Sequence, residues 1–199
     1  LTSGFTPRWI SHFRAQFSRD QQQSYSNTSD VLVKIPTMLD GMGRSNVLPR
    51  QNREHRLHLA ETLSIEGTRN SWKFGGDGLL TWIYDFFPSQ QSGEYLFYPI
   101  KVNPFTFDPM ESGLQLTPLR AFAHEVPHYY LQNFGSATSR PDTNEYAAFA
   151  QDTIRVTDHL AVNLGVRWDL QTFTTKGLIS NPLFPPSGKV PFQPYNFAP

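Results

Sequence analysis

Residues 144–169, NEYAAFAQDTIRVTDHLAVNLGVRWD, show the clearest strand pattern of the chain. Its second half alternates, with Leu160, Val162, Leu164, Val166 and Trp168 on one side and Ala161, Asn163, Gly165, Arg167 and Asp169 on the other. A period of two over this length predicts a strand with one apolar face at 159–170. Residues 145–156 are predicted to be a second strand, and Thr157-Asp158 the tight turn between the two.

Three further segments alternate in the same way: residues 8–18, 55–66 and 71–86. Each collects aromatic or aliphatic side chains on one face and polar ones on the other, which predicts strands of about 11–12 residues or longer. Glu61 is an exception, because it falls on an otherwise apolar face. In the third segment Gly75, Gly76 and Gly78 interrupt the pattern and predict a bulge or bend.

The connections between these segments differ greatly in length. Residues 67–70 and 157–158 are short turns, whereas 19–52 and 171–199 are predicted to be long loops. Short extended pieces are predicted at 94–98 and 128–134, with irregular chain at 99–120, a loop at 135–143 and, because of its prolines, no regular structure from 171 onward. If successive strands run up and down, both short turns lie on one side and both long loops on the other. Outer-membrane barrels have short periplasmic turns and long extracellular loops.

The composition agrees with such a barrel. Aromatic residues make up 14% and charged residues only 17%, yet the mean hydropathy is −0.44. Only alternate residues of a barrel strand meet lipid, so the average stays polar. No stretch approaches the roughly 20 apolar residues of a spanning helix. The fold class predicted is therefore all-β: an antiparallel up-and-down meander of about seven strands, part of a larger transmembrane β-barrel in the bacterial outer membrane.

Other totals limit the possible functions. The formal net charge is zero, which gives no reason to expect nucleic acid as a partner. The chain has no cysteine, so disulfides and thiolate chemistry are excluded. No nucleophile elbow, nucleotide fingerprint or acid/base pair of carboxylates is found, and no enzyme and no cofactor are expected. LTSGFTPRW shows no signal-peptide pattern, and both ends of the chain are interpreted as cuts.

The hairpin at 144–169 resembles a stretch typical of TonB-dependent outer-membrane receptors, and of Oar-like receptors in particular. The shared features, in order, are Tyr146 and Phe149, Gln151-Asp152, Thr157-Asp158, Leu160 and Gly165-Val166-Arg167-Trp168-Asp169. SWKFGGD at 71–77, GEYLF at 93–97 and NFAP at 196–199 are similar to further motifs of that family. The resemblance implies a barrel of about 22 strands with an N-terminal plug that is absent from this chain.

The same resemblance implies the partners. They are outer-membrane lipid, the TonB complex acting through the missing plug region, and an unknown extracellular ligand bound by the long loops. The expected lipid-facing or girdle residues are Trp9, Phe13, Phe17, Leu57, Leu59, Trp72, Phe74, Trp82, Tyr84, Leu160, Val162, Leu164, Val166 and Trp168. The expected lumen-facing residues are Lys73, Asp77, Asn163, Gly165, Arg167 and Asp169.

Two alternatives stay open at this point. A soluble β-sandwich that binds carbohydrate through Trp and Tyr would show the same alternation with its faces reversed. A zinc hydrolase is suggested by His124-Glu125-Val126-Pro127-His128, which has the H-E-x-x-H spacing. Pro127 argues against the helix that this motif needs, and the resemblance places the motif at a short periplasmic turn. Gly75-Gly76-Asp77-Gly78 lacks the Lys-Ser/Thr of a phosphate loop.

Overall fold

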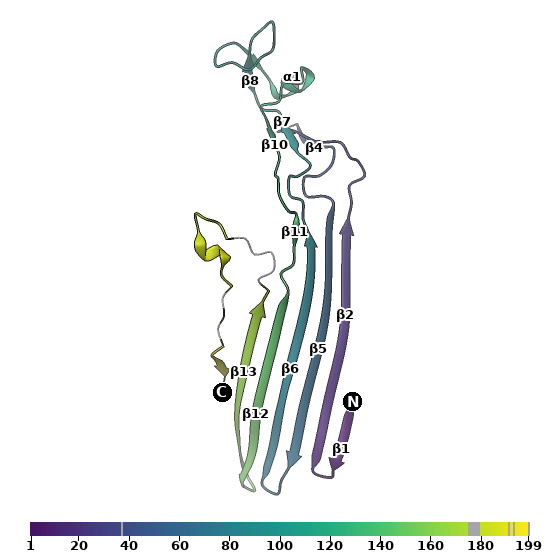
Figure 1. Ribbon diagram of the computed structural model, residues 1–199, viewed down its shortest axis with the longest axis vertical. Helices are drawn as coiled ribbons and strands as arrows, with labels where there is room; N and C mark the ends of the chain where they lie inside the picture. Colours follow the sequence, from purple (N-terminus) through teal and green to yellow (C-terminus); the bar gives the residue numbers. More distant parts are fainter. Residues whose placement is uncertain (37, 175–179, 191, 193, 199) are drawn as a thin grey trace. The chain divides into compact units, whose positions relative to one another are not determined.

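The computed structural model describes residues 1–36, 38–174, 180–190, 192 and 194–198 (Figure 1). These residues form two compact units. The sheet unit comprises Leu1–Gln21, Arg53–Tyr84 and Arg140–Pro199, and the connection unit comprises Gln22–Asn52 and Asp85–Ser139.

Long neighbouring strands make up the sheet unit (Figure 1). The order is β1-β2-β5-β6-β12-β13-β14, and β11, whose residues belong to the connection unit, pairs with Asp85 and Phe86 at the end of β6. The bounds are β1 Thr2–Thr6, β2 Trp9–Ser24, β5 Arg50–Glu66, β6 Asn70–Phe86, β11 Thr138–Ser139, β12 Thr143–Thr157, β13 Leu160–Phe173 and β14 Asn196–Ala198. Within the described residues this antiparallel sheet is open, with β1 and β14 at its two edges.

The predicted strands are all present, and most are longer than the alternation indicated. β2 continues to Ser24 and β5 begins at Arg50, so both extend into the predicted loop 19–52. Seven strands do form the path of the sheet, but they are not the expected seven. The pieces at 94–98 and 128–134 lie elsewhere, and β1 and β14 take their places.

The two short turns close two hairpins. At the first, the backbone N–H of Gly67 donates to the carbonyl of Asn70 over 2.7 Å. At the second, Asp158 and His159 form the turn, one residue later than predicted, and the N–H of His159 donates to Thr157 Oγ1. From there β12 and β13 pair up to Thr143 opposite Phe173, with one shift of register beside the turn, between Arg155 and Thr157.

The predicted bulge at the glycines of β6 is wrong. β6 pairs with β12 in an unbroken register from Asn70–Ile154 to Thr81–Thr143. Gly75 lies opposite Phe149, and a Cβ on it would come within 2.5 Å of the Phe149 ring and 2.6 Å of the Glu61 carbonyl oxygen. The glycine therefore makes room for an aromatic ring on the neighbouring strand, and the register with β12 continues past it without a shift.

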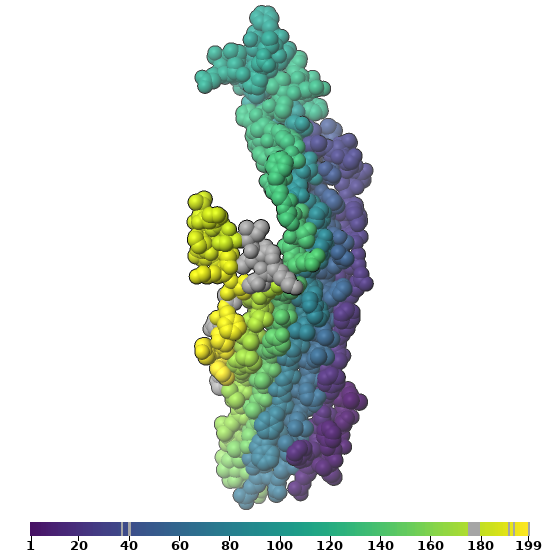
Figure 2. Space-filling model, viewed as in Figure 1, coloured from purple at the N-terminus to yellow at the C-terminus, as the bar shows by residue number. Residues whose placement is uncertain are grey.

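Among the described residues, no second layer covers either face of the sheet unit. Leu164 is 58% exposed and Val166 50%. Side chains of β2, β5, β6 and β12 lie directly at the surface in the space-filling view (Figure 2). The unit thus differs from a sandwich, in which one face of each sheet is buried against the other.

The connection unit has a fold of its own. Its sheet has the order β10-β7-β3-β4, with β3 parallel to β7. The bounds are β3 Leu32–Ile35, β4 Leu39–Met42, β7 Glu94–Leu96 and β10 Tyr129–Leu131, with a hairpin of β8 Ile100–Val102 and β9 Leu114–Leu116 and the helix α1 Pro118–Ala123. Its core is Ile35, Phe97, Val102, Leu116 and Ala121. The prediction of irregular chain at 19–52 and 99–120 is therefore wrong for much of both stretches.

The helix α1 ends where the H-E-x-x-H motif begins. Thr117 caps its first turn, with Oγ1 accepting from the N–H of Arg120 over 3.4 Å, and Pro118 follows. His124 is the C-cap, and Glu125 has a φ of 57°. The motif is therefore not helical. Its predicted place in a short periplasmic turn is also wrong, because it belongs to the connection of residues 87–142 between β6 and β12.

The segment after β13 is partly regular, contrary to the prediction from its prolines. β13 itself runs to Phe173, a 3-10 helix η1 spans Pro185–Gly188, and β14 pairs with β13 through Asn196 opposite Asp169. The predicted next strand NFAP thus forms over its first three residues. Pro199 and residues 175–179 of the predicted loop lie outside the described residues.

Candidate functional site

The register sorts the side chains of the sheet unit onto two faces. Trp72, Asp152 and Leu164 lie opposite one another on β6, β12 and β13, so they share a face. Arg53 contacts the ring of Tyr84, and Ser11 contacts Glu61, which extends this face to β5 and β2. All fourteen residues expected to face lipid lie on this face, hereafter the apolar face. All six expected to face the lumen lie on the other, the polar face.

The apolar face has the dimensions of a membrane band. Trp72 and Trp82 stand ten residues apart on β6. At ~3.3 Å per residue and a tilt of ~40°, the two rings are ~25 Å apart along the membrane normal, the height of the apolar band of outer-membrane barrels. Between them lies Phe74, exposed by 43%. That this face meets lipid stays a prediction.

Two carboxylates interrupt the apolar face. Glu61 accepts a hydrogen bond of 2.5 Å from Ser11 Oγ on β2. Asp152 accepts one of 2.8 Å from Asn70 Nδ2, at the first residue of β6 beside a short turn. A hydrogen-bond donor lowers the cost of keeping a carboxylate out of bulk water. The sequence showed the anomaly at Glu61, but its partner and the second pair come from the register.

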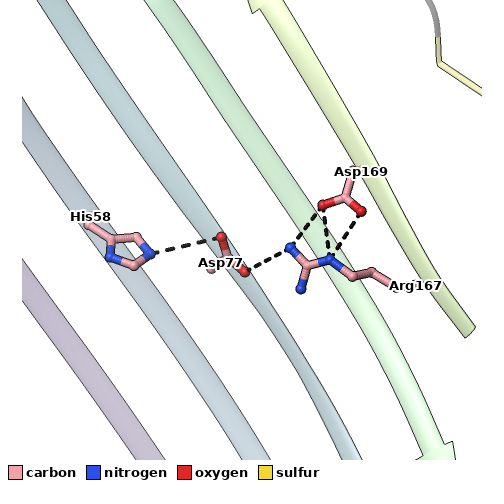
Figure 3. A network of polar contacts seen from close by, with 4 residues as sticks. All are labelled: His58, Asp77, Arg167 and Asp169. Carbon is pink, nitrogen blue, oxygen red and sulfur yellow. Dashed lines mark hydrogen bonds and ion pairs between the residues drawn. The ribbon is translucent and has the colours of Figure 1, made fainter. Parts of the chain in front are cut away.

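A network of polar contacts connects three strands on the polar face (Figure 3). Arg167 holds Asp169 through Nε at 3.0 Å and a terminal nitrogen at 2.8 Å, and that terminal nitrogen lies 3.6 Å from Asp77. His58 Nε2 lies 3.8 Å from the other oxygen of Asp77. Ala147 stands between Asp77 and Asp169 in the register, and its small side chain leaves room for Arg167 to reach across β12.

The network joins three of the six predicted lumen residues and adds His58, which was not predicted. The others lie nearer the short turns: Thr153 Oγ1 donates to Asn163 Oδ1 over 2.7 Å, and Lys73 and Gly165 both lie opposite Gln151. The groups bond to one another and leave no obvious nucleophile beside a free base. The arrangement can tie β5, β6 and β13 together and line a polar space.

In the connection unit, a buried carboxylate joins the two long connections. Glu94 is only 4% exposed, and its Oε2 lies 3.2 Å from Lys34 Nζ and 2.7 Å from Asn46 Nδ2. Lys34 and Asn46 come from the connection between β2 and β5, and Glu94 from the one between β6 and β12. Removing one partner of a buried ion pair is costly, so this contact holds the two connections in one body.

Aromatic rings gather on β7, β10 and the residues beside them. The ring of Tyr98 lies 6.0 Å from Tyr129 and 5.8 Å from His128, and both tyrosines are more than a third exposed. His124 instead stacks on Phe107 at 4.1 Å. The two histidines of the H-E-x-x-H motif thus have separate aromatic partners, and no cluster of three potential metal ligands is found in the described part of the chain.

The fold and the two faces define a class, the bacterial outer-membrane β-barrel proteins. A family model described as an outer membrane beta barrel domain matches residues 1–194, and the chain belongs to this family. It is a protein of the bacterial outer membrane. The alternative of a soluble β-sandwich is therefore wrong. No curated protein and no solved structure matches the chain. No helix among the described residues is long and apolar enough to cross a membrane.

Proposed function

We propose that this chain is part of a TonB-dependent receptor, similar to the Oar-like receptors, that binds and imports a bulky ligand or acts at the cell surface. The resemblance of residues 144–169 supports this proposal, as does the membership of the outer-membrane barrel family. The observation that carries it is the folded connection unit, with its buried Glu94 and its own core. A barrel that served only as an open pore would have no need of such an ordered body on its long connections.

Ligand would bind the connection unit, and energy would come from the TonB complex through a plug. The proposal assigns no bond-making chemistry to the chain. The exposed rings of Tyr98, His128 and Tyr129 offer a surface of amphipathic groups, which suits a ligand with both apolar and hydroxyl-bearing faces. The polar face, with Arg167 and its neighbours, would line the route inside the barrel.

The test is direct binding of TonB to the intact protein. Purified periplasmic domain of TonB is titrated against the intact protein in detergent, and association is followed by calorimetry. We expect saturable one-to-one binding, and none to an outer-membrane barrel of similar size without a plug. Equal binding to both proteins, or binding to neither, would contradict the proposal.

A further inference from the structure

A basic cluster lies on the apolar face, at the strand ends away from the short turns. Arg53 is the fourth residue of β5, Tyr84 is close to the end of β6, and Arg140 comes shortly before β12. The guanidinium carbons of Arg53 and Arg140 lie 4.4 and 5.8 Å from the centre of the same Tyr84 ring. Two positive charges are thus held against one aromatic ring, which orients them without neutralising them.

The cluster lines a cavity of about 320 Å³ together with His55, Trp82 and Asp142. Asp142 Oδ1 accepts a hydrogen bond of 2.8 Å from the backbone N–H of Ile83. Within the described residues neither arginine makes an ion pair with a carboxylate. Arg53 Nε is itself buried and has no hydrogen-bond partner, so contact with a ligand falls to the terminal nitrogens. The two guanidinium groups therefore keep donors for a ligand.

The height of the cluster on the sheet points to the kind of ligand. Trp82 is at the upper limit of the ~25 Å apolar band, and Tyr84 is two residues farther, which is ~5 Å along the membrane normal. This is the level of lipid head groups. The long connections leave the sheet at this end, so the head groups are those of the outer leaflet. Arginine binds phosphate through paired N–H donors. The outer leaflet of the bacterial outer membrane contains a phosphorylated glycolipid, whose membrane anchor is lipid A.

We propose that Arg53 and Arg140 form a binding site for the phosphate groups of lipid A. Tyr84 holds the two guanidinium groups, and Trp82 packs beside the acyl chains and sugar below them. The site needs the apolar face to meet lipid and the long connections to lie outside. Binding of lipid A does not depend on TonB. The lipid site can therefore be disproved while the proposed receptor function holds, and the receptor function can be disproved while the lipid site holds.

The experiment measures lipid A on the intact protein. The protein is purified in mild detergent, and bound lipid A is quantified by mass spectrometry for the unaltered protein and for the double variant Arg53→Gln, Arg140→Gln. We expect the double variant to retain at least tenfold less lipid A. Arg56→Gln is the matched control, because Arg56 lies on the same strand but on the polar face, where it pairs with Glu54. It should retain as much lipid A as the unaltered protein.

A second measurement needs no variant. Delipidated protein is placed in vesicles that contain lipid A or lipid A stripped of its phosphates, and the lipid bound is compared. We expect a tenfold preference for the phosphorylated form that millimolar inorganic phosphate does not abolish. The proposal is overturned if the two forms bind alike, if free phosphate displaces the lipid completely, or if Arg56→Gln loses as much as the double variant.

Discussion

The sheet unit and the connection unit bury their apolar side chains in opposite ways. Seven of the eight buried hydrophobic residues in the described part of the chain belong to the connection unit, and only Ala147 belongs to the sheet unit. The sheet unit has long strands and many large apolar side chains, yet most are exposed. The connection unit therefore has a buried core of its own, whereas the exposed apolar side chains of the sheet unit agree with the prediction that lipid covers one of its faces.

The largest expected effect is in the connection unit. Leu116 is 1% exposed in its core, so Leu116→Ala removes buried methyl groups and leaves a cavity. We expect a loss of ~2–5 kcal/mol in the free energy of unfolding of this unit. Hydrogen exchange of the intact protein in lipid should show faster exchange at β8 and β9 and unchanged exchange at β12 and β13.

Leu164→Ala in β13 is the control for that measurement. Its side chain is 58% exposed on the apolar face, so we expect only a small loss, because lipid on this face would fill the space that the shorter side chain leaves. A loss as large as that of Leu116→Ala would show that the row on β13 is packed inside protein. The division between the two units would then be wrong.

The next effect tests which face meets lipid. Val166 lies on the apolar face and Asn163 on the polar face of the same strand. Val166→Arg should lower the free energy of unfolding in lipid vesicles by ~2–4 kcal/mol, because arginine is costly within the apolar band. Asn163→Arg should change it by less than ~1 kcal/mol. If Asn163→Arg proves the more damaging, the two faces have been assigned in reverse.

The faces of the sheet unit could be predicted because a strand has a period of two. Once the strand is known, every side chain is assigned to one face or the other, and the register keeps the fourteen residues expected to face lipid apart from the six expected to face the lumen. The short turns mark the register of each hairpin. The contacts of the polar network could not be predicted from the period alone. His58 is a single residue with no motif around it, and only the pairing of the strands places it beside Asp77.

The connection unit could not be predicted, because the prediction of strands depends on a visible period of two. Its strands have only three or four residues, too few to show a period. Its sheet depends on the parallel pairing of Leu32 with Glu94, which are far apart in the sequence. Proline-rich chain can still fold when distant segments supply its hydrogen bonds and its core. The composition of these segments predicted loops, but contacts between residues far apart in the sequence fold them into the connection unit.

A smaller effect is expected where the sheet unit does pack tightly. Gly75→Ala would bring a methyl group within 2.5 Å of the Phe149 ring, so the ring or the backbone must shift. We expect a loss of ~1–3 kcal/mol in urea unfolding of the protein in vesicles. Gly78→Ala is the matched control on the same strand, since its methyl group would meet the Tyr146 ring at an ordinary 3.6 Å. Equal losses would mean that strand propensity, and not the ring, explains the glycines.

The smallest effect is expected at the polar network. Asp77→Asn keeps the shape but removes a charge that lies 3.6 Å from Arg167 and 3.8 Å from His58. Arg167 keeps Asp169, and all these groups are partly exposed, so screening by water limits the change to ~0–1 kcal/mol in urea unfolding. A loss above ~2 kcal/mol would show that the polar face is buried away from water. A small loss that disappears at high salt would instead place the network beside a water-filled interior, as the assignment of the two faces requires.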